Sequence, residues 1–203
     1  MRVRVTEQST EILRRPLSYA YRPSAFGPLR VYSLSDDGID WAVGLHSGHI
    51  PYRSIRRLRM SFRPTGMQPR RFVVELWAEG APKLTIASSS WKSITEQERL
   101  DQPYTTFVQE LHRRISNAGQ SARFQQGSNP LIYWPSLVVF AAVALGIAGL
   151  TVQALRAGTT SGAALVGAFL VLFVWQGGNF MRRNRPGTYR ADALPKGVMP
   201  PPQ

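Results

Sequence analysis

Two long runs without a charged residue dominate the pattern of hydrophobic and polar positions. The first run covers residues 131–155 and the second covers residues 157–181. About 20 helical residues span the hydrocarbon core of a bilayer, so Pro135–Ala154 and Ser161–Phe180 are long enough to cross it. A core helix of a soluble protein would carry a polar stripe at 3.6-residue spacing, and neither run has one. The pattern therefore predicts a two-helix transmembrane hairpin over residues 133–181.

The residues that flank the two runs predict how the hairpin is oriented. The short connection carries Arg156 alone, whereas basic residues follow the second run, and the positive-inside rule then places the N-terminal region and the C-terminus in the cytoplasm. The first run begins about 130 residues into the chain, so it is not a signal peptide. Expected interface anchors on the cytoplasmic side are Tyr133, Trp134, Trp175, Arg182 and Arg183.

Small residues recur at four-residue spacing within both runs, as in Ala142 and Gly146, Ala163 and Gly167, and Ala164 and Ala168. This spacing allows close helix packing, either within the hairpin or in a homo-oligomer. Neither run contains Asp, Glu, Lys or His, which disfavours the alternative function of an oligomeric channel or transport subunit gated by the cytoplasmic domain. Residues 182–203 are rich in Pro and Arg and are expected to form a disordered basic tail.

The first 130 residues show a different pattern, in which short apolar runs alternate with turn residues. Runs of four to eight residues with β-branched or aromatic side chains predict antiparallel strands. An amphipathic helix follows at Pro103–Asn117, with Asp101 as the expected N-cap and Gly119 as the stop. The hairpin turns are strongest at Asp36-Asp37-Gly38 and Glu79-Gly80. The predicted strands are Leu29–Leu34, Gly38–Val43, His49–Tyr52, Ile55–Phe62, Phe72–Ala78 and Lys83–Ser88.

The stretch from Tyr32 to Met60 resembles the PH-like (pleckstrin-homology-like) domains of small bacterial membrane proteins. It has a strand, an acidic-Gly turn, a second strand and then Ile50-Pro51-Tyr52 followed by Ile55 and Leu58. The resemblance covers about residues 29–117. It implies an α+β fold with a PH-like antiparallel β-barrel or sandwich and one C-terminal helix, usually without a catalytic site, next to transmembrane helices in the inner membrane.

The expected organisation has five parts. They are an N-terminal extension (1–28), the PH-like domain (29–119), a linker (120–132), the transmembrane hairpin (133–181) and the tail (182–203).

A cluster of arginines occupies the predicted strand Ile55–Phe62 and its flanks. Alternation places Arg57, Arg59, Ser61 and Arg63 on one face and Leu58, Met60 and Phe62 on the other. Three interpretations remain open: a solvated face that discourages edge pairing, a surface for anionic phospholipid headgroups, or a site for an unidentified membrane protein. The candidate binding residues are Arg56, Arg57, Arg59 and Arg63.

Composition narrows the function further. The chain has 25 Lys and Arg against 12 Asp and Glu, a net charge of +13, which by itself favours nucleic acid. Five of these net charges belong to residues 131–203, where they act as a topology signal, and aromatic residues such as Tyr52 and Phe62 serve the core. A nucleic-acid partner is therefore not expected.

Candidate chemistry is sparse. The chain has no cysteine, and it lacks a nucleophile elbow, a P-loop and a dinucleotide fingerprint. His46 and His49 flank a Ser-Gly turn and could hold a metal with one of the acids Asp36, Asp37 and Asp40, but an ordinary surface turn is the favoured interpretation. We expect no enzyme activity, no cofactor and no metal, and a role as a protein of the lipid bilayer that presents an interaction or scaffold module at the membrane surface.

Overall fold

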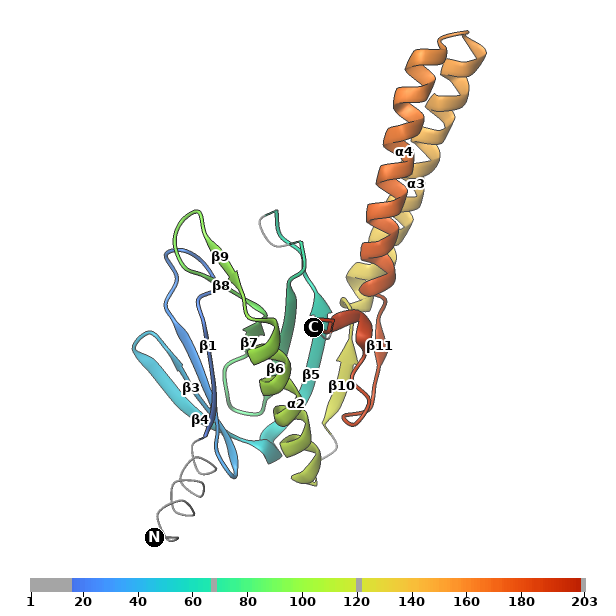
Figure 1. The fold of residues 1–203 in the computed structure, drawn as a ribbon. Helices are drawn as coiled ribbons and strands as arrows, with labels where there is room; N and C mark the ends of the chain where they lie inside the picture. Colours follow the sequence, from blue (N-terminus) through green and yellow to red (C-terminus); the bar gives the residue numbers. More distant parts are fainter. Residues whose placement is uncertain (1–15, 67–68, 120–121, 202–203) are drawn as a thin grey trace, which may run out of the picture.

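The computed structural model describes residues 16–66, 69–119 and 122–201, and it is an α+β structure with two larger β-sheets and three α-helices (Figure 1). The predicted strands Gly38–Val43, Ile55–Phe62 and Phe72–Ala78 are confirmed with the same bounds. Three other predicted strands are present with shifted ends, as β2 (Arg30–Leu34), β4 (His46–Pro51) and β7 (Leu84–Ala87).

The first sheet is an antiparallel meander of four strands in the order β1-β2-β3-β4, where β3 is Gly38–Val43. Its first strand, β1 (Leu17–Tyr21), pairs along its whole length with β2 and buries Tyr19 and Tyr21. The predicted extension 1–28 is therefore wrong for residues 17–28, which belong to the β domain. The first 15 residues lie outside the described residues.

The second sheet has the order β11-β10-β5-β6-β7, where β5 is Ile55–Phe62 and β6 is Phe72–Ala78. A short 3₁₀ turn, η1 (Tyr52–Ser54), leads from β4 into β5. β10 (Arg123–Gln126) pairs in parallel with β5, and β11 (Gly187–Thr188) pairs with β10. The expected linker 120–132 is therefore wrong, because β10 covers the edge of β5 that a three-stranded sheet would leave open.

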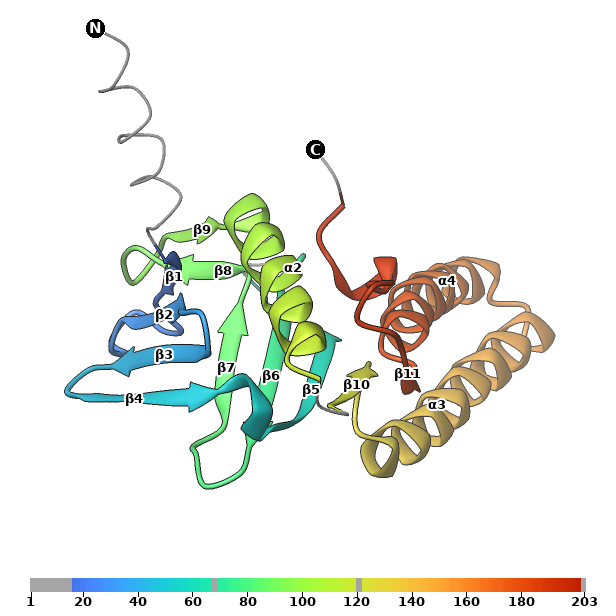
Figure 2. The ribbon, with the colours of Figure 1, turned by 90° about the horizontal axis from the view of Figure 1, so that it is seen from below.

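The core lies between the two sheets and α2 (Asp101–Asn117), which crosses the gap between them (Figure 2). Phe107, Leu111 and Ile115 of α2 are fully buried, as the helical spacing predicted. Asp101 is not the N-cap, because the helix begins at Asp101 itself and Leu100 occupies the cap without a side-chain bond. β8 (Ser89–Trp91) and β9 (Gln97–Arg99), which were not predicted, form a hairpin before α2.

Tyrosine hydroxyls join the two sheets along β7. Tyr19 donates to the carbonyl of Ala87 over 2.6 Å, and Tyr32 donates to the carbonyl of Thr85 over 2.9 Å. Tyr21 also donates to Thr85. Because these carbonyls lie at the edge strand of the second sheet, the hydroxyls replace a part of the strand pairing that the edge lacks.

The turns differ in their use of glycine. Gly80 and Gly119 have positive φ, as expected for a hairpin turn and a helix stop. Gly38 does not have positive φ, so the β2–β3 turn does not need glycine for the left-handed conformation that hairpin turns commonly require. A side chain at Gly38 would instead collide with the carbonyl of Ile50 on β4. Glycine is needed at that position for the close approach of two strands.

The two apolar runs form α3 (Pro130–Arg156) and α4 (Thr160–Arg183), which lie side by side and leave the β domain as a separate projection (Figure 1). At 1.5 Å per residue they are about 40 and 36 Å long. Both are long and apolar enough to cross a membrane, and none of the residues in their most apolar windows is buried. The connection turns at Gly158, which has positive φ.

Residues 184–201 return to the β domain. After β11, the chain forms η2 (Lys196–Val198), and Val198 and Met199 join the hydrophobic core. The expectation of a disordered tail is wrong for these residues. Proline and arginine are frequent in this segment, but a few apolar side chains suffice because the hydrophobic core of the β domain offers them a partner surface.

Candidate functional site

The outer face of the second sheet gathers basic side chains around Trp77. The guanidinium of Arg57 lies 4.0 Å from the centroid of the Trp77 ring. The guanidinium of Arg59 and the ammonium of Lys83 each lie 5.5 Å from the same centroid. Arg123 stands opposite Arg57 in the register of β10 and β5. These contacts form a cationic surface built on one aromatic ring.

Glu75 is the acid at the centre of this surface. It is 4% exposed, and its two oxygens accept from Arg63 at 2.6 Å and Lys83 at 2.8 Å. Burial alone would raise the pKa of Glu75, but the bonds and charges of Lys83 and Arg63 outweigh it and lower the pKa below its ordinary value. One carboxylate therefore fixes two cations and leaves the remaining positive charge of the face unbalanced.

The alternation predicted for β5 is present, because Leu58, Met60 and Phe62 are buried. Arg57 and Arg59 lie on the opposite face, where Arg59 also donates to Gln125 of β10 over 3.2 Å. Partial burial and the neighbouring charge of Arg57 lower the pKa of Arg59. These arginines are held by their neighbours and do not extend freely into solvent.

Arg56 lies apart from the other three candidate arginines. The pairing of β5 with β6 shifts register between Ile55 and Arg57, and the side chain of Arg56 binds Glu79 at the β6–β7 turn. Trp77, Glu75 and Lys83 were not predicted as site residues. Trp77 and Glu75 lie on β6, and Lys83 directly precedes β7, so only the pairing of the strands brings them to the arginines.

Asn184 forms the junction between the second sheet and the helix pair. Its amide nitrogen donates to the carbonyl of Phe62 over 2.8 Å, and its amide oxygen accepts from the N–H of Phe62 over 3.1 Å. The Asn184 carbonyl accepts from Ser128 just before α3, over 2.9 Å. A side-chain amide thus continues the pairing of β5 beyond β10 and ties the base of both helices to the sheet.

The predicted anchors lie near this base. Trp134 and Trp175 are largely exposed, whereas Tyr133 is buried with its ring 5.3 Å from that of Trp134. Arg183 lies over the ring of Phe62 at 4.9 Å, and Arg182 is exposed. Tyr133 and Arg183 therefore contact the protein, while Trp134, Trp175 and Arg182 face outward as anchors require.

The small-residue positions divide into two groups. Ala163 is buried, and a side chain at Gly167 would touch Thr151 of α3, so this pair lies in the contact between the helices. A side chain at Gly177 would collide with Phe140. Among the described residues, Gly146 has no neighbour within reach of a side chain, and its partner Ala142 is exposed. The helix contact thus uses only part of the small-residue pattern.

His112 holds the C-terminal segment against α2. The ring is 1% exposed, with Nδ1 at 2.6 Å from the carbonyl of Val108 and Nε2 at 2.7 Å from the hydroxyl of Tyr189. A carbonyl only accepts, so Nδ1 carries the proton and Nε2 accepts from Tyr189. Burial lowers the pKa of His112 to about 4, so the ring is neutral at pH 7.

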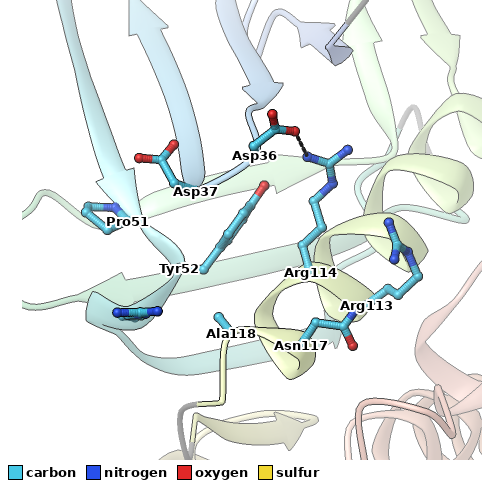
Figure 3. Close-up of a pocket in the computed structure, with 9 residues that line it drawn as sticks. Asp36, Asp37, Pro51, Tyr52, Arg113, Arg114, Asn117 and Ala118 are labelled. Carbon is cyan, nitrogen blue, oxygen red and sulfur yellow. Dashed lines mark ion pairs between the residues drawn. The ribbon is translucent and has the colours of Figure 1, made fainter. Parts of the chain in front are cut away.

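A solvent-open pocket of about 600 Å³ lies where α2 ends near η1 and the β2–β3 turn (Figure 3). Tyr52 lies between Asp37 and Arg114, whose guanidinium donates to the carbonyl of Ser35 over 2.6 Å and is 4.0 Å from Asp36. Arg113 is bound to Glu110. Within the lining, Arg114 pairs with Asp36, whereas the partner of Arg113 lies outside the pocket.

The two histidines do not build a metal site. His49 contacts Asp40 at 2.7 Å and Asp37 at 3.6 Å. Within the described part of the chain, no group of three or more His, Cys, Asp or Glu side chains is placed to hold a metal ion.

Comparison of the chain with protein-family models, curated proteins and solved structures gave no match.

Proposed function

We propose that this chain is a non-enzymatic integral membrane protein that presents a PH-like interaction or scaffold module at the cytoplasmic surface of a bacterial inner membrane. The observation that carries the proposal is the helix pair, whose apolar exterior is exposed along its length and which is anchored in the second sheet through Asn184. An exposed apolar surface of this extent requires a bilayer or a large partner to cover it.

The arrangement of the β domain supports the PH-like part of the proposal. A four-stranded meander is followed by β5-β6-β7 in a second sheet and then by α2, which closes the core between them. The β8–β9 hairpin and the strands β10 and β11 are additions to this plan. β10 and β11 connect the module to the helices on either side.

The return of the C-terminal segment supports an even number of spans. Residues 184–201 pack on the β domain, so that domain and this segment share one side of any membrane that α3 and α4 cross. The choice of the cytoplasmic side follows from the basic residues near the helix base, including Arg182, Arg183 and Arg185, against Arg156 at the far connection.

The cationic face around Trp77 is the proposed partner surface. Trp and Arg are the residues that contribute most to binding at protein interfaces, and Trp77, Arg57 and Arg59 are half-buried on this face. β5 runs toward the helix base in Figure 1, and an anionic segment of another membrane protein is the partner whose charge complements this face.

The test has two parts, both on the full-length chain. Reporters active only in the cytoplasm or only in the periplasm are fused at Gln203 and in the connection after Arg156. Resistance of the protein to alkaline extraction measures whether it is integrated into the membrane. Periplasmic activity at Gln203 or release by alkali would contradict the membrane proposal.

For the partner surface, a photo-crosslinking residue replaces Lys83 on the face, with Pro82 as the matched control position. Crosslinks in native membranes are expected at Lys83, and they should be lost in an Arg57→Ala/Arg59→Ala background. Equal crosslinking at both positions would contradict the assignment of this face.

A further inference from the structure

The exposed large apolar side chains of the β domain lie in three of its connections. Among the described residues outside α3 and α4, the exposed large hydrophobic side chains are Phe26, Leu29, Leu45 and Ile94. Phe26 is 86% exposed and Ile94 is 65% exposed. They belong to the β1–β2, β3–β4 and β8–β9 connections, and none lies in the β2–β3 or β6–β7 connection.

These connections are neighbours in space. A pocket of about 390 Å³ is lined by Pro23 of the β1–β2 connection, Arg71 before β6, and Trp91 and Gln97 of the β8–β9 hairpin. The backbone N–H of Trp91 donates to the carbonyl of Arg22 over 3.0 Å. A side chain at Gly44 would touch Pro28, which brings the β3–β4 turn to the same group. We call this group of connections the loop end.

The loop end faces the direction in which the helix pair extends. In Figure 1, the β1–β2, β5–β6 and β8–β9 connections project from the end of the β domain on which α3 and α4 rise, and the β2–β3 connection lies at the opposite end. The junction at Asn184 and the pairing of β10 and β11 hold the helices in this relation to the sheet. A bilayer crossed by the helices would therefore lie in front of the loop end.

The loop end has a net positive charge. It carries the basic residues Arg22, Arg63, Arg70 and Lys92 against the acid Glu96, while Arg63 also pairs with Glu75 and Lys92 with Glu98. A cytoplasmic leaflet with anionic lipids attracts basic segments by about 1 kcal/mol for each Lys or Arg near its surface. Exposed aromatic and aliphatic side chains among basic residues are the combination that binds a membrane interface.

We propose that the loop end docks onto the leaflet that α3 and α4 enter, with Phe26 and Ile94 inserted at the level of the lipid headgroups. This inference rests on the proposed membrane function and adds to it a second contact with lipid. The contact fixes the tilt of the β domain on the bilayer, so the cationic face around Trp77 stays oriented toward neighbours in the membrane plane.

The test uses the full-length chain in nanodiscs of phosphatidylcholine and phosphatidylglycerol, and the absence of cysteine allows one labelled position at a time. An environment-sensitive fluorophore is placed by Ser93→Cys at the loop end, by Pro82→Cys at the far end, or by Val143→Cys on α3. Spin-labelled lipids then quench each probe according to its depth. The Ser93 probe is repeated in a Phe26→Ser/Ile94→Ser background, which leaves the probe position unchanged.

We expect shallow spin labels to quench the Ser93 probe and deep ones to quench the Val143 probe, while the Pro82 probe stays unquenched. In the double-serine background the ratio of docked to undocked domains should fall about tenfold or more, because each apolar side chain adds to the buried area. High salt should weaken quenching at Ser93 only, since it screens the basic residues.

The outcomes separate the two proposals. If the Ser93 probe is quenched no more than the Pro82 probe while Val143 is quenched, the loop-end inference is wrong and the two-span proposal holds. If Val143 is not quenched, both are overturned. Quenching at Ser93 that survives the double-serine change would also overturn the roles given to Phe26 and Ile94.

Discussion

Asn184 is the residue whose replacement most directly tests the junction. Its side chain is 1% exposed and satisfies both the N–H and the carbonyl of Phe62, at 3.1 and 2.8 Å, with a third bond to the carbonyl of Phe180 at 3.3 Å. The change Asn184→Ala removes the amide and leaves two backbone groups of a buried strand end without a partner. Each such group costs about 1–3 kcal/mol.

We expect a total loss of about 3 kcal/mol in the free energy of unfolding, since the strand end can relax in part. For a chain of this size that loss lowers the melting temperature by about 6–12 °C. Thermal unfolding of the full-length protein in detergent measures it, and hydrogen exchange at the amide of Phe62 locates it. Asn184→Asp should lose at least as much at neutral pH, because a carboxylate would face the carbonyls of Phe62 and Phe180.

The control is Asn117→Ala, which removes the same side chain at an exposed position at the end of α2. It should melt within about 2 °C of the wild type. If Asn184→Ala also melts within that range and the Phe62 amide keeps its protection, then Asn184 is not the tie between the sheet and the helix pair.

Three further changes have defined outcomes. The pKa of His112 is about 4 in the folded protein and about 6.5 in the unfolded chain, so the neutral ring stabilises the fold fully above pH 6.5. The free energy of unfolding should fall by about 3 kcal/mol as the pH drops from 6.5 to 4. Chemical unfolding of His112→Gln should show a smaller fall across this window, and a pH profile equal to that of the wild type would refute the argument. Gly177→Ala should lower the melting temperature, because the new methyl group collides with Phe140 and weakens the contact between α3 and α4. Gly178→Ala should melt as the wild type does, because its methyl group has no described neighbour within 4 Å. Equal melting temperatures of the two variants would contradict this packing. Glu75→Gln should destabilise the protein by about 1–2 kcal/mol at pH 7, since its two cationic partners are half exposed. The difference should begin to fall as the pH drops below about 4.5, the ordinary pKa of the carboxyl, and should vanish only below the lowered pKa of Glu75 in the folded protein; a difference that persists in stronger acid would point to packing instead.

The elements that could be predicted are those with a strong local period. β5 alternates between arginine and apolar residues over eight positions, and its bounds were predicted without error. α3 and α4 carry apolar residues on every face, so their existence and their exposed surfaces follow from composition alone. In each case neighbouring positions along the chain contain the whole signal.

The elements that were missed depend on partners far away in the sequence. β1 has five residues, and its burial of Tyr19 and Tyr21 requires the rest of the first sheet. β10 finds its partner β5 more than 60 residues earlier, and Asn184 bonds to Phe62 across 122 residues. No local pattern distinguishes such a strand from a linker, or such an asparagine from one in a disordered tail.

The candidate site divides in the same way. The arginines of β5 are visible in the sequence, but Trp77 and Glu75 join them only through the register of β5 and β6, and Lys83 only through the turn that leads into β7. The exposed side chains of Phe26 and Ile94 lie in connections that are otherwise mostly polar. A single hydrophobic residue in such a segment gives no periodic pattern from which its exposure could be predicted. Their common position appears only after the sheets are assembled.

The sequence by itself determined where the chain is apolar over a full helix length, where apolar and polar residues alternate along a strand, and that cysteine is absent. Each of these is a property of composition or of neighbouring residues. Only the tertiary structure decided that residues 184–201 return to the β domain, that β10 closes the edge of β5, and that the loop end and the helix pair extend in one direction. The physical reason is that a pairing of distant backbone groups depends on the positions of both partners, and these are set by the packing of the whole core.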